Sequence, residues 1–172
     1  MKKLVILVAM VVLIGCTRHY IAGIYPIRSE LLTTGFTGKS TITLINDYGE
    51  KSYNIQVGVT DAFTYYGDLK QITEVSATLL SEELTKRGMI VKTNGDKTIR
   101  LKVKNMFMVY HMFGYRATIV LSVGAGNEYS REFAETNSSG LDQRCLDGAI
   151  SNVIAAVLND EDFVNYLIQG RE

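Results

Sequence analysis

The sequence of 172 residues contains only two histidines, two cysteines and one proline. His19 lies three residues after Cys16, and His111 lies in an apolar stretch where a histidine is more often structural than catalytic. No serine has glycine two residues before it and two after it, which is the pattern of a hydrolase nucleophile. No spacing of metal ligands is present either. These absences predict a protein that is not an enzyme, with no metal and no cofactor.

The chain also lacks an excess of charge of either sign, with 18 basic and 18 acidic residues. Binding to nucleic acid needs a concentrated basic face, so this balance argues against a nucleic-acid partner. The only spaced basic cluster is Arg100, Lys102 and Lys104. On a strand these residues form one solvated face, with a contact to anionic lipid as the alternative.

No apolar run is long enough to cross a bilayer, which takes about 20 residues. Residues 4–14 are all apolar, follow Lys2 and Lys3, and are followed by Gly15 and Cys16. A basic start, a short apolar run and a small residue are typical of a secretory signal. Residues 13–16 resemble the lipobox of bacterial lipoproteins, in which the cysteine receives a diacylglyceryl group and the peptide bond before it is cleaved. A signal-anchor helix and an ordinary cleaved signal are the alternatives.

The lipobox predicts a lipoprotein signal peptide over residues 1–15, cleavage between Gly15 and Cys16, and lipid on Cys16. In the sorting of such lipoproteins an aspartate after the cysteine retains the protein in the inner membrane. Thr17 stands there, which favours the outer membrane, periplasmic side, over the periplasmic face of the inner membrane. A lipidated Cys16 leaves Cys145 without an internal partner, so Cys145 is either a buried apolar residue or the site of a disulfide between chains.

The sequence after the signal divides into two parts. Residues 16–38 include Pro26 and predict a lipidated tether with an irregular lead-in, and residues 39–172 predict a single domain. Alternating patterns predict strands over residues 41–46, 52–59, 89–92, 99–109, 115–123 and 129–136. Helices are expected over residues 69–87 and 146–158, with Ser138 and Ser139 as candidate caps of the second and a short apolar turn at 163–168.

This element order predicts an α+β fold. We expect an antiparallel sheet of about five to six strands with two main helices packed on one face. The first helix has the clearest ends, because Asp68 and Gln71 fit a capping box and Gly88 fits a left-handed C-terminal cap.

Aromatic residues gather in two segments of the chain. Tyr65 and Tyr66 lie in an expected loop over residues 60–67, and Phe107, Tyr110 and Phe113 lie in an expected hairpin. Either both segments are buried in the core, or the hairpin tip is exposed and binds a protein or faces lipid. These five residues are the candidate partner-binding residues.

Three segments resemble the YajG-type family of bacterial outer-membrane lipoproteins. They are residues 84–88 with the strand that follows, residues 129–131 at the end of the strand meander, and residues 157–160 with 163–167 at the close of the last helix. The resemblance implies an outer-membrane lipoprotein with a small α/β periplasmic domain, no catalytic activity and no residue of assigned role.

Composition, lipobox and hairpin together predict a lipid-anchored envelope lipoprotein that is not an enzyme. Its partners would be the membrane, through the lipid, and another envelope protein that docks on the hairpin. The alternative function is a small-ligand or lipid-binding auxiliary lipoprotein of a transport system, with an apolar groove between sheet and helices.

Overall fold

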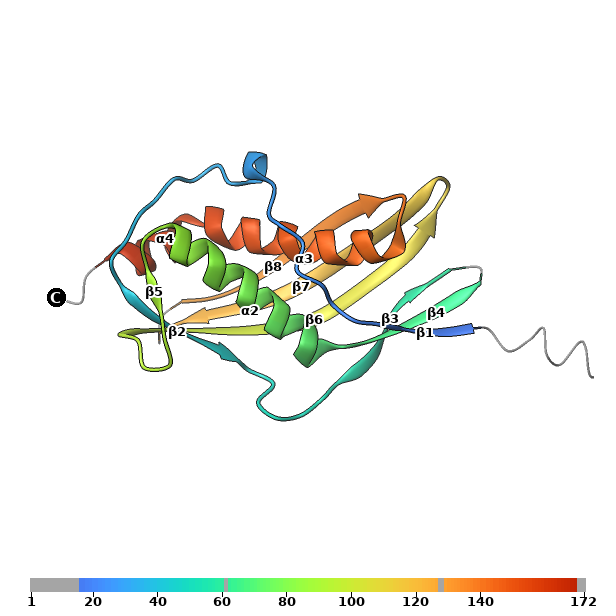
Figure 1. Cartoon of the computed structure of the whole chain (residues 1–172), viewed down its shortest axis with the longest axis horizontal. Coiled ribbons are helices and arrows are strands. Elements are labelled where there is room, and N and C mark those ends of the chain that lie inside the picture. The colour runs from blue at the N-terminus through green and yellow to red at the C-terminus, as the bar shows by residue number, and fades with distance from the viewer. Residues whose placement is uncertain (1–15, 61, 127–128, 170–172) are drawn as a thin grey trace, which may run out of the picture.

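A computed structural model describes residues 16–60, 62–126 and 129–169 (Figure 1). The described chain forms an α+β fold with one open eight-stranded sheet and three α-helices. The strands are β1 (Cys16–Tyr20), β2 (Thr41–Asn46), β3 (Asn54–Val59), β4 (Phe63–Asp68), β5 (Ile90–Val91), β6 (Lys97–His111), β7 (Gly114–Ala125) and β8 (Tyr129–Ser139). The predicted signal peptide and Gly15 lie outside the described residues.

Strand β6 is the centre of the sheet and makes it mixed. One edge of β6 pairs antiparallel with β7, which pairs antiparallel with β8. The other edge pairs parallel with β2 over Lys97–Leu101 and parallel with β3 at Met108 and Val109. The prediction of a purely antiparallel sheet of five to six strands is therefore wrong. Parallel strands need a crossover of a dozen or more residues, and the first helix lies in the connection that brings β6 back parallel to β2 and β3.

Helix α2 (Leu69–Lys86) confirms the first predicted helix. Asp68 is its N-cap and accepts a hydrogen bond from the amide of Lys70 at 2.9 Å. Gly88 follows with φ +85°, a conformation that glycine adopts without steric cost, so the predicted C-terminal cap is also confirmed.

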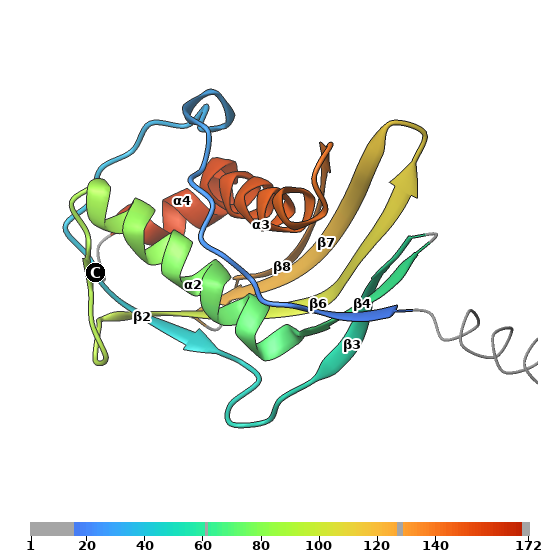
Figure 2. The same ribbon diagram turned by 45° about the vertical axis from the view of Figure 1, so that its right-hand side comes forward.

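Two helices close the chain, α3 (Asp142–Asn159) and α4 (Glu161–Ile168), and Asp160 caps the second of them. Ser138 and Ser139 are the last residues of β8 and are not helix caps, contrary to the prediction. They stay in the sheet because they continue the ladder with β7, where Ser139 is paired with Tyr115. Helices α2 and α3 lie side by side on one face of the sheet, as predicted (Figures 1 and 2).

The core lies between these helices and the sheet. In β6 the alternation predicted from the sequence is confirmed, because Ile99, Leu101 and Val103 are buried and Arg100 and Lys104 are exposed. A bulge between Val103 and Asn105 then shifts the alternation by one residue. Beyond it Met106 and Met108 are buried and Phe107 and Val109 face outward. The face of β6–β8 that the helices leave bare is called the uncovered face below.

Two segments differ from the predicted loops. Residues 63–68 form β4, where Tyr65 and Gly67 are buried and Tyr66 is half-buried, so this stretch alternates like the other strands. The predicted tether begins as strand β1, which pairs parallel with β4. The only other regular element between β1 and β2 is a single turn of 3-10 helix, η1 (Ser29–Leu31).

Candidate functional site

The predicted lipid-bearing residue is exposed and is the first residue of β1. Cys16 is paired with Phe63 of β4. Two residues later, the guanidinium of Arg18 lies 3.7 Å from the ring centroid of Phe63 and 3.6 Å from Asp142 of α3. Because β1 begins at Cys16 itself, a lipid at the predicted position would be joined to the sheet without a linker of unpaired residues.

The segment after β1 runs along α3 and is fastened to it by side chains of the helix (Figure 2). Asp147 accepts hydrogen bonds from the hydroxyl of Tyr20 at 2.7 Å and from the amide of Gly23 at 3.0 Å. Asn159 accepts from the amides of Thr33 and Thr34 and donates to the carbonyl of Leu31 at 2.6 Å. Burial, with the charge of Asp147 and the hydrogen bond to it, raises the pKa of Tyr20 well above its usual range.

Tyr65 belongs to the same joint between β1, β4 and α3. Its ring is buried and its hydroxyl donates a 2.6 Å hydrogen bond to Asp142. Burial, that bond and the charge of Asp142 raise the pKa of Tyr65 to about 12, against a smaller lowering effect of Arg18. Burial also favours the neutral acid of Asp142, but hydrogen bonds from Tyr65 and the Gln143 amide, with the charge of Arg18, lower its pKa overall. Tyr65 thus has a structural role and offers no surface to a partner.

The other candidate residues lie at one end of the sheet but not in one patch. Phe107 and Val109 are 38% and 40% exposed on the uncovered face. Val59 is paired with Val109, and Tyr66 lies on the same face of β4. These four side chains form the outer patch, an apolar strip that crosses β6, β3 and β4.

The turn between β6 and β7 forms the second exposed group. Phe113 is 93% exposed, Met112 is 73% exposed and Tyr110 is 49% exposed. We call these three residues the tip. Tyr110 packs against its strand partner Tyr115, with ring centroids 5.5 Å apart, on the same face of the hairpin as the buried Met108. The structure therefore favours the second reading of this hairpin, in which its end is exposed.

The five candidate residues chosen from the sequence did not include Met112 or the two valines of the outer patch. Val109 could have been found if the bulge had been placed, since the shift after Val103 turns Phe107 and Val109 to the same face. Val59 could not have been found from the sequence, because it is paired with Val109, which lies 50 positions later in the chain. Met112 is one of the apolar residues that crowd this hairpin in the sequence, but only the structure shows its backbone conformation. It is the one non-glycine residue with a positive φ, +36°, in the described chain.

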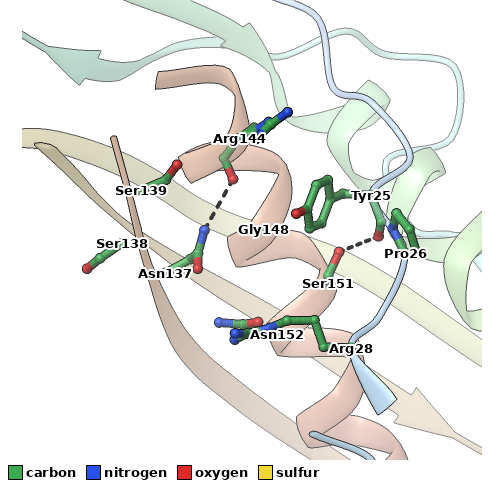
Figure 3. Close-up of a pocket in the computed structure, with 10 residues that line it drawn as sticks. All are labelled: Tyr25, Pro26, Arg28, Asn137, Ser138, Ser139, Arg144, Gly148, Ser151 and Asn152. Carbon is green, nitrogen blue, oxygen red and sulfur yellow. Dashed lines mark hydrogen bonds between the residues drawn. The ribbon is translucent and has the colours of Figure 1, made fainter. Parts of the chain in front are cut away.

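A polar hollow of about 190 Å³ lies between the end of β8, helix α3 and residues 25–28 (Figure 3). Asn137 donates to the carbonyl of Arg144 at 3.2 Å, and Ser151 donates to the carbonyl of Tyr25. Pockets for small molecules are mostly apolar and have volumes of about 300 Å³ or more. Because the side chains of this hollow join segments of the chain and its size is small, it does not favour the ligand-binding alternative.

The described residues contain no group of three or more His, Cys, Asp or Glu side chains arranged to hold a metal ion. None of the helices that the structure describes is long and apolar enough to cross a membrane. His19 and His111 are both exposed and lie on different strands. Cys145 is buried in α3, where burial raises its pKa.

Neither a protein-family model nor a curated protein matches the sequence. Among solved structures, the chain is similar to the crystal structure of protein XCC0632 from Xanthomonas campestris, which is assigned to the family DUF330. The two share 11% identity with a TM-score of 0.45, over 88% of this chain and 93% of that one.

Proposed function

We propose that this chain is a lipid-anchored envelope lipoprotein that is not an enzyme and that acts as an interaction or scaffold module. Cys16 would carry the lipid on the periplasmic side of the outer membrane. The outer patch would bind another envelope protein. We also propose membership of the YajG-type lipoproteins, supported by the lipobox and the three segments that resemble that family.

The observation that carries the proposal is the exposed outer patch, which lies at the end of the sheet where Cys16 begins β1. Phe107 and Val109 are large apolar residues on a sheet face that none of the described helices covers, and Val59 extends them onto the next strand. Exposed apolar side chains that lie next to one another mark contact surfaces more often than isolated ones do. Aromatic residues are also enriched at the centres of protein interfaces.

Lipidation is tested first, by the mass of the mature N-terminal peptide and by membrane fractionation. We expect a diacylglyceryl group on Cys16 and loss of the membrane-bound form in Cys16→Ser, because a folded domain without acyl chains loses its hydrophobic anchor. Thr17→Asp, by the sorting rule above, should move the protein to the inner membrane. A Cys16→Ser protein that stays in the membrane fraction and matures as before would refute the anchoring.

Docking on the outer patch is tested by photo-crosslinking in intact cells, with a benzoylphenylalanine placed at residue 107. We expect a crosslink to one or a few envelope proteins, which is lost when Val109→Ser is added. The matched control carries the probe at Arg100, which is exposed on β6 near the far end of the strand. Equal crosslinking from both positions, or none from residue 107, would contradict the proposed docking surface.

A further inference from the structure

We infer that the tip (Tyr110, Met112 and Phe113) enters the surface of the bilayer that holds the Cys16 lipid. This inference rests on the proposed anchoring at Cys16, and it assigns the tip to lipid while the outer patch stays with a protein partner. The tip would lie in the interface between the lipid headgroups and the acyl chains.

The strand pairing places Cys16 and the tip at the same end of the molecule. Cys16 begins β1, which runs parallel to β4, so it lies at the end of the sheet where β4 begins. Strand β3 is antiparallel to β4 and ends there, and β6 is parallel to β3 and reaches its turn there. Both ribbon views show β1, the β3–β4 hairpin and the β6–β7 turn together at this end, with the C-terminal helix at the other (Figures 1 and 2).

The register also shows how far the tip extends. Thr17, Thr64, Val59 and Val109 form one row across the sheet, so Cys16 shares the next row with Tyr110. Three strand spacings separate β1 from β6, which is about 15 Å. Beyond that row β6 continues through His111 into the turn, which adds about 7 Å along the strand at roughly 3.3 Å per residue. Interfacial segments bury their apolar side chains about 5–10 Å into the boundary of headgroups and acyl chains. The distance by which the turn extends beyond the row of Cys16 falls within this range of depths.

The two residues of the turn are unusual for a β-hairpin. Two-residue hairpin turns usually carry Asn-Gly, Asp-Gly or another glycine pair, because these residues accept positive φ. Here the two residues are Met112 and Phe113, and Met112 has φ +36°. A side chain with a Cβ is unfavourable in this region. The turn therefore keeps two large apolar side chains in water, and one of them, Met112, stands where glycine would be less strained. Such an arrangement is expected when those side chains have a partner.

The charge behind the tip fits a lipid surface. Arg116 is exposed three residues after Phe113, on the uncovered face, and is paired in register with Val109. It forms no ion pair within the described residues. A guanidinium set behind an apolar tip can reach phosphate oxygens of the headgroups while the tip lies among the chains.

The test uses the absence of tryptophan from the chain. Phe113→Trp in the full lipidated protein gives a single fluorescent indole at the tip, called the tip probe below. The protein is reconstituted in vesicles of phosphatidylethanolamine and phosphatidylglycerol with or without bromine on the acyl chains. We expect a blue shift of the emission of the tip probe and about twofold or greater quenching by the brominated lipid, because interfacial burial brings the ring near the bromines.

Ile90→Trp is the matched control, since Ile90 is an exposed apolar residue in β5 at the opposite end of the sheet. Its emission should stay that of a water-exposed ring, with no quenching. Arg116→Gln should reduce quenching of the tip probe more in vesicles with phosphatidylglycerol than in vesicles of the zwitterionic lipid alone.

Two results would overturn the inference and are distinct from each other. Acylated protein in which the tip probe is neither shifted nor quenched refutes the lipid contact and leaves the anchoring intact. If a photo-crosslinker at residue 113 then captures an envelope protein, the tip belongs to that protein. Preparations in which the N-terminal peptide carries no acyl group refute the proposed anchoring, and the inference falls with it.

Discussion

The hydroxyl of Tyr20 donates a 2.7 Å hydrogen bond to Oδ1 of Asp147, and this bond joins strand β1 to the second turn of helix α3. Both residues are buried, and Asp147 also accepts from the amide of Gly23 and the side chain of Gln143. The segment that follows Cys16 is thereby part of the folded domain.

Removing one side of this bond should destabilise the protein. We expect Tyr20→Phe to lower the free energy of unfolding by about 1–2 kcal/mol, because Asp147 loses one of its buried donors. Asp147→Ala should cost about 2–4 kcal/mol, since it leaves the Tyr20 hydroxyl and the Gly23 amide without their acceptor. Urea denaturation measures both. Tyr25→Phe is the control, because the Tyr25 hydroxyl makes no hydrogen bond within the described residues, and a loss equal to that of Tyr20→Phe would contradict this account.

The bulge in β6 predicts that substitutions at two neighbouring residues differ in their effect on stability. Met108 is fully buried against the helices, whereas its neighbour Val109 lies on the uncovered face. Met108→Ala should lower the free energy of unfolding by about 2–5 kcal/mol through lost contacts and a cavity. Val109→Ala should cost less than about 1 kcal/mol, since it removes a half-exposed side chain from a strand. Thermal or urea unfolding measures both free energies. Equal losses from the two substitutions would mean that Met108 and Val109 are equally buried, which would contradict the position of the bulge.

The turn at Met112 predicts a gain in stability from a substitution that harms the proposed contact. Met112→Gly removes a left-handed residue with a Cβ, which costs about 1–2 kcal/mol, against about 0.5–1 kcal/mol for the greater entropy of glycine in the unfolded chain. We expect a net stabilisation of about 0.5 kcal/mol in urea denaturation. Added to Phe113→Trp, the same substitution should weaken the quenching of the tip probe by brominated lipid.

Phe113→Gly provides the comparison for that turn, since Phe113 does not have a positive φ. It gains no relief of strain and should be slightly destabilised by the entropy of glycine. If both glycine variants change stability in the same direction, the strain at Met112 does not contribute.

The joint at Tyr65 predicts loss of stability at alkaline pH. The pKa of Tyr65 is raised to about 12 in the folded protein, and that of an unfolded tyrosine is about 10. A raised pKa contributes stability that is fully present below pH of about 10 and is lost as the pH rises through 12. In Tyr65→Phe the free energy of unfolding should therefore fall less between pH of about 10 and about 12 than in the wild type, as measured by urea denaturation at each pH.

Tyr20 adds to the same fall in the wild type, since its pKa is raised as well. The Tyr65→Phe, Tyr20→Phe double variant should accordingly show the flattest profile. A double variant whose free energy of unfolding falls as steeply as that of the wild type over this pH range would refute the assignment to the buried tyrosines.

The parts of the fold that the sequence predicted are those set by neighbouring residues. Helix α2 was predicted with both ends because Asp68 and Gly88 act within one turn of it. The inward and outward sides of β6 were predicted up to Val103, where strict alternation ends. The mixed sheet was not predicted, because parallel pairing of β2 with β6 joins residues about 55 positions apart and has no local signal.

The candidate site was predicted only in part for a similar reason. Phe107, Tyr110 and Phe113 were selected as aromatic residues in a hairpin, but whether such residues are buried depends on how far the helices extend over the sheet. Tyr65 and Tyr66 share that composition, yet one is buried under α3 and the other lies on the opposite face. The two tyrosines lie on opposite faces because side chains alternate along β4. The sequence does not reveal this alternation, because both faces of the strand carry aromatic residues.

Strand β1 also determines how the domain would respond to a mechanical load applied at the proposed anchor, Cys16. All five residues of β1 are paired in parallel with β4, so tension applied at Cys16 along the strand would shear the whole ladder at once. Such an arrangement resists rupture far better than a hairpin peeled open one bond at a time. With the proposed anchor at Cys16, a force from the proposed partner would then reorient the domain as a rigid unit before it could extract the first strand.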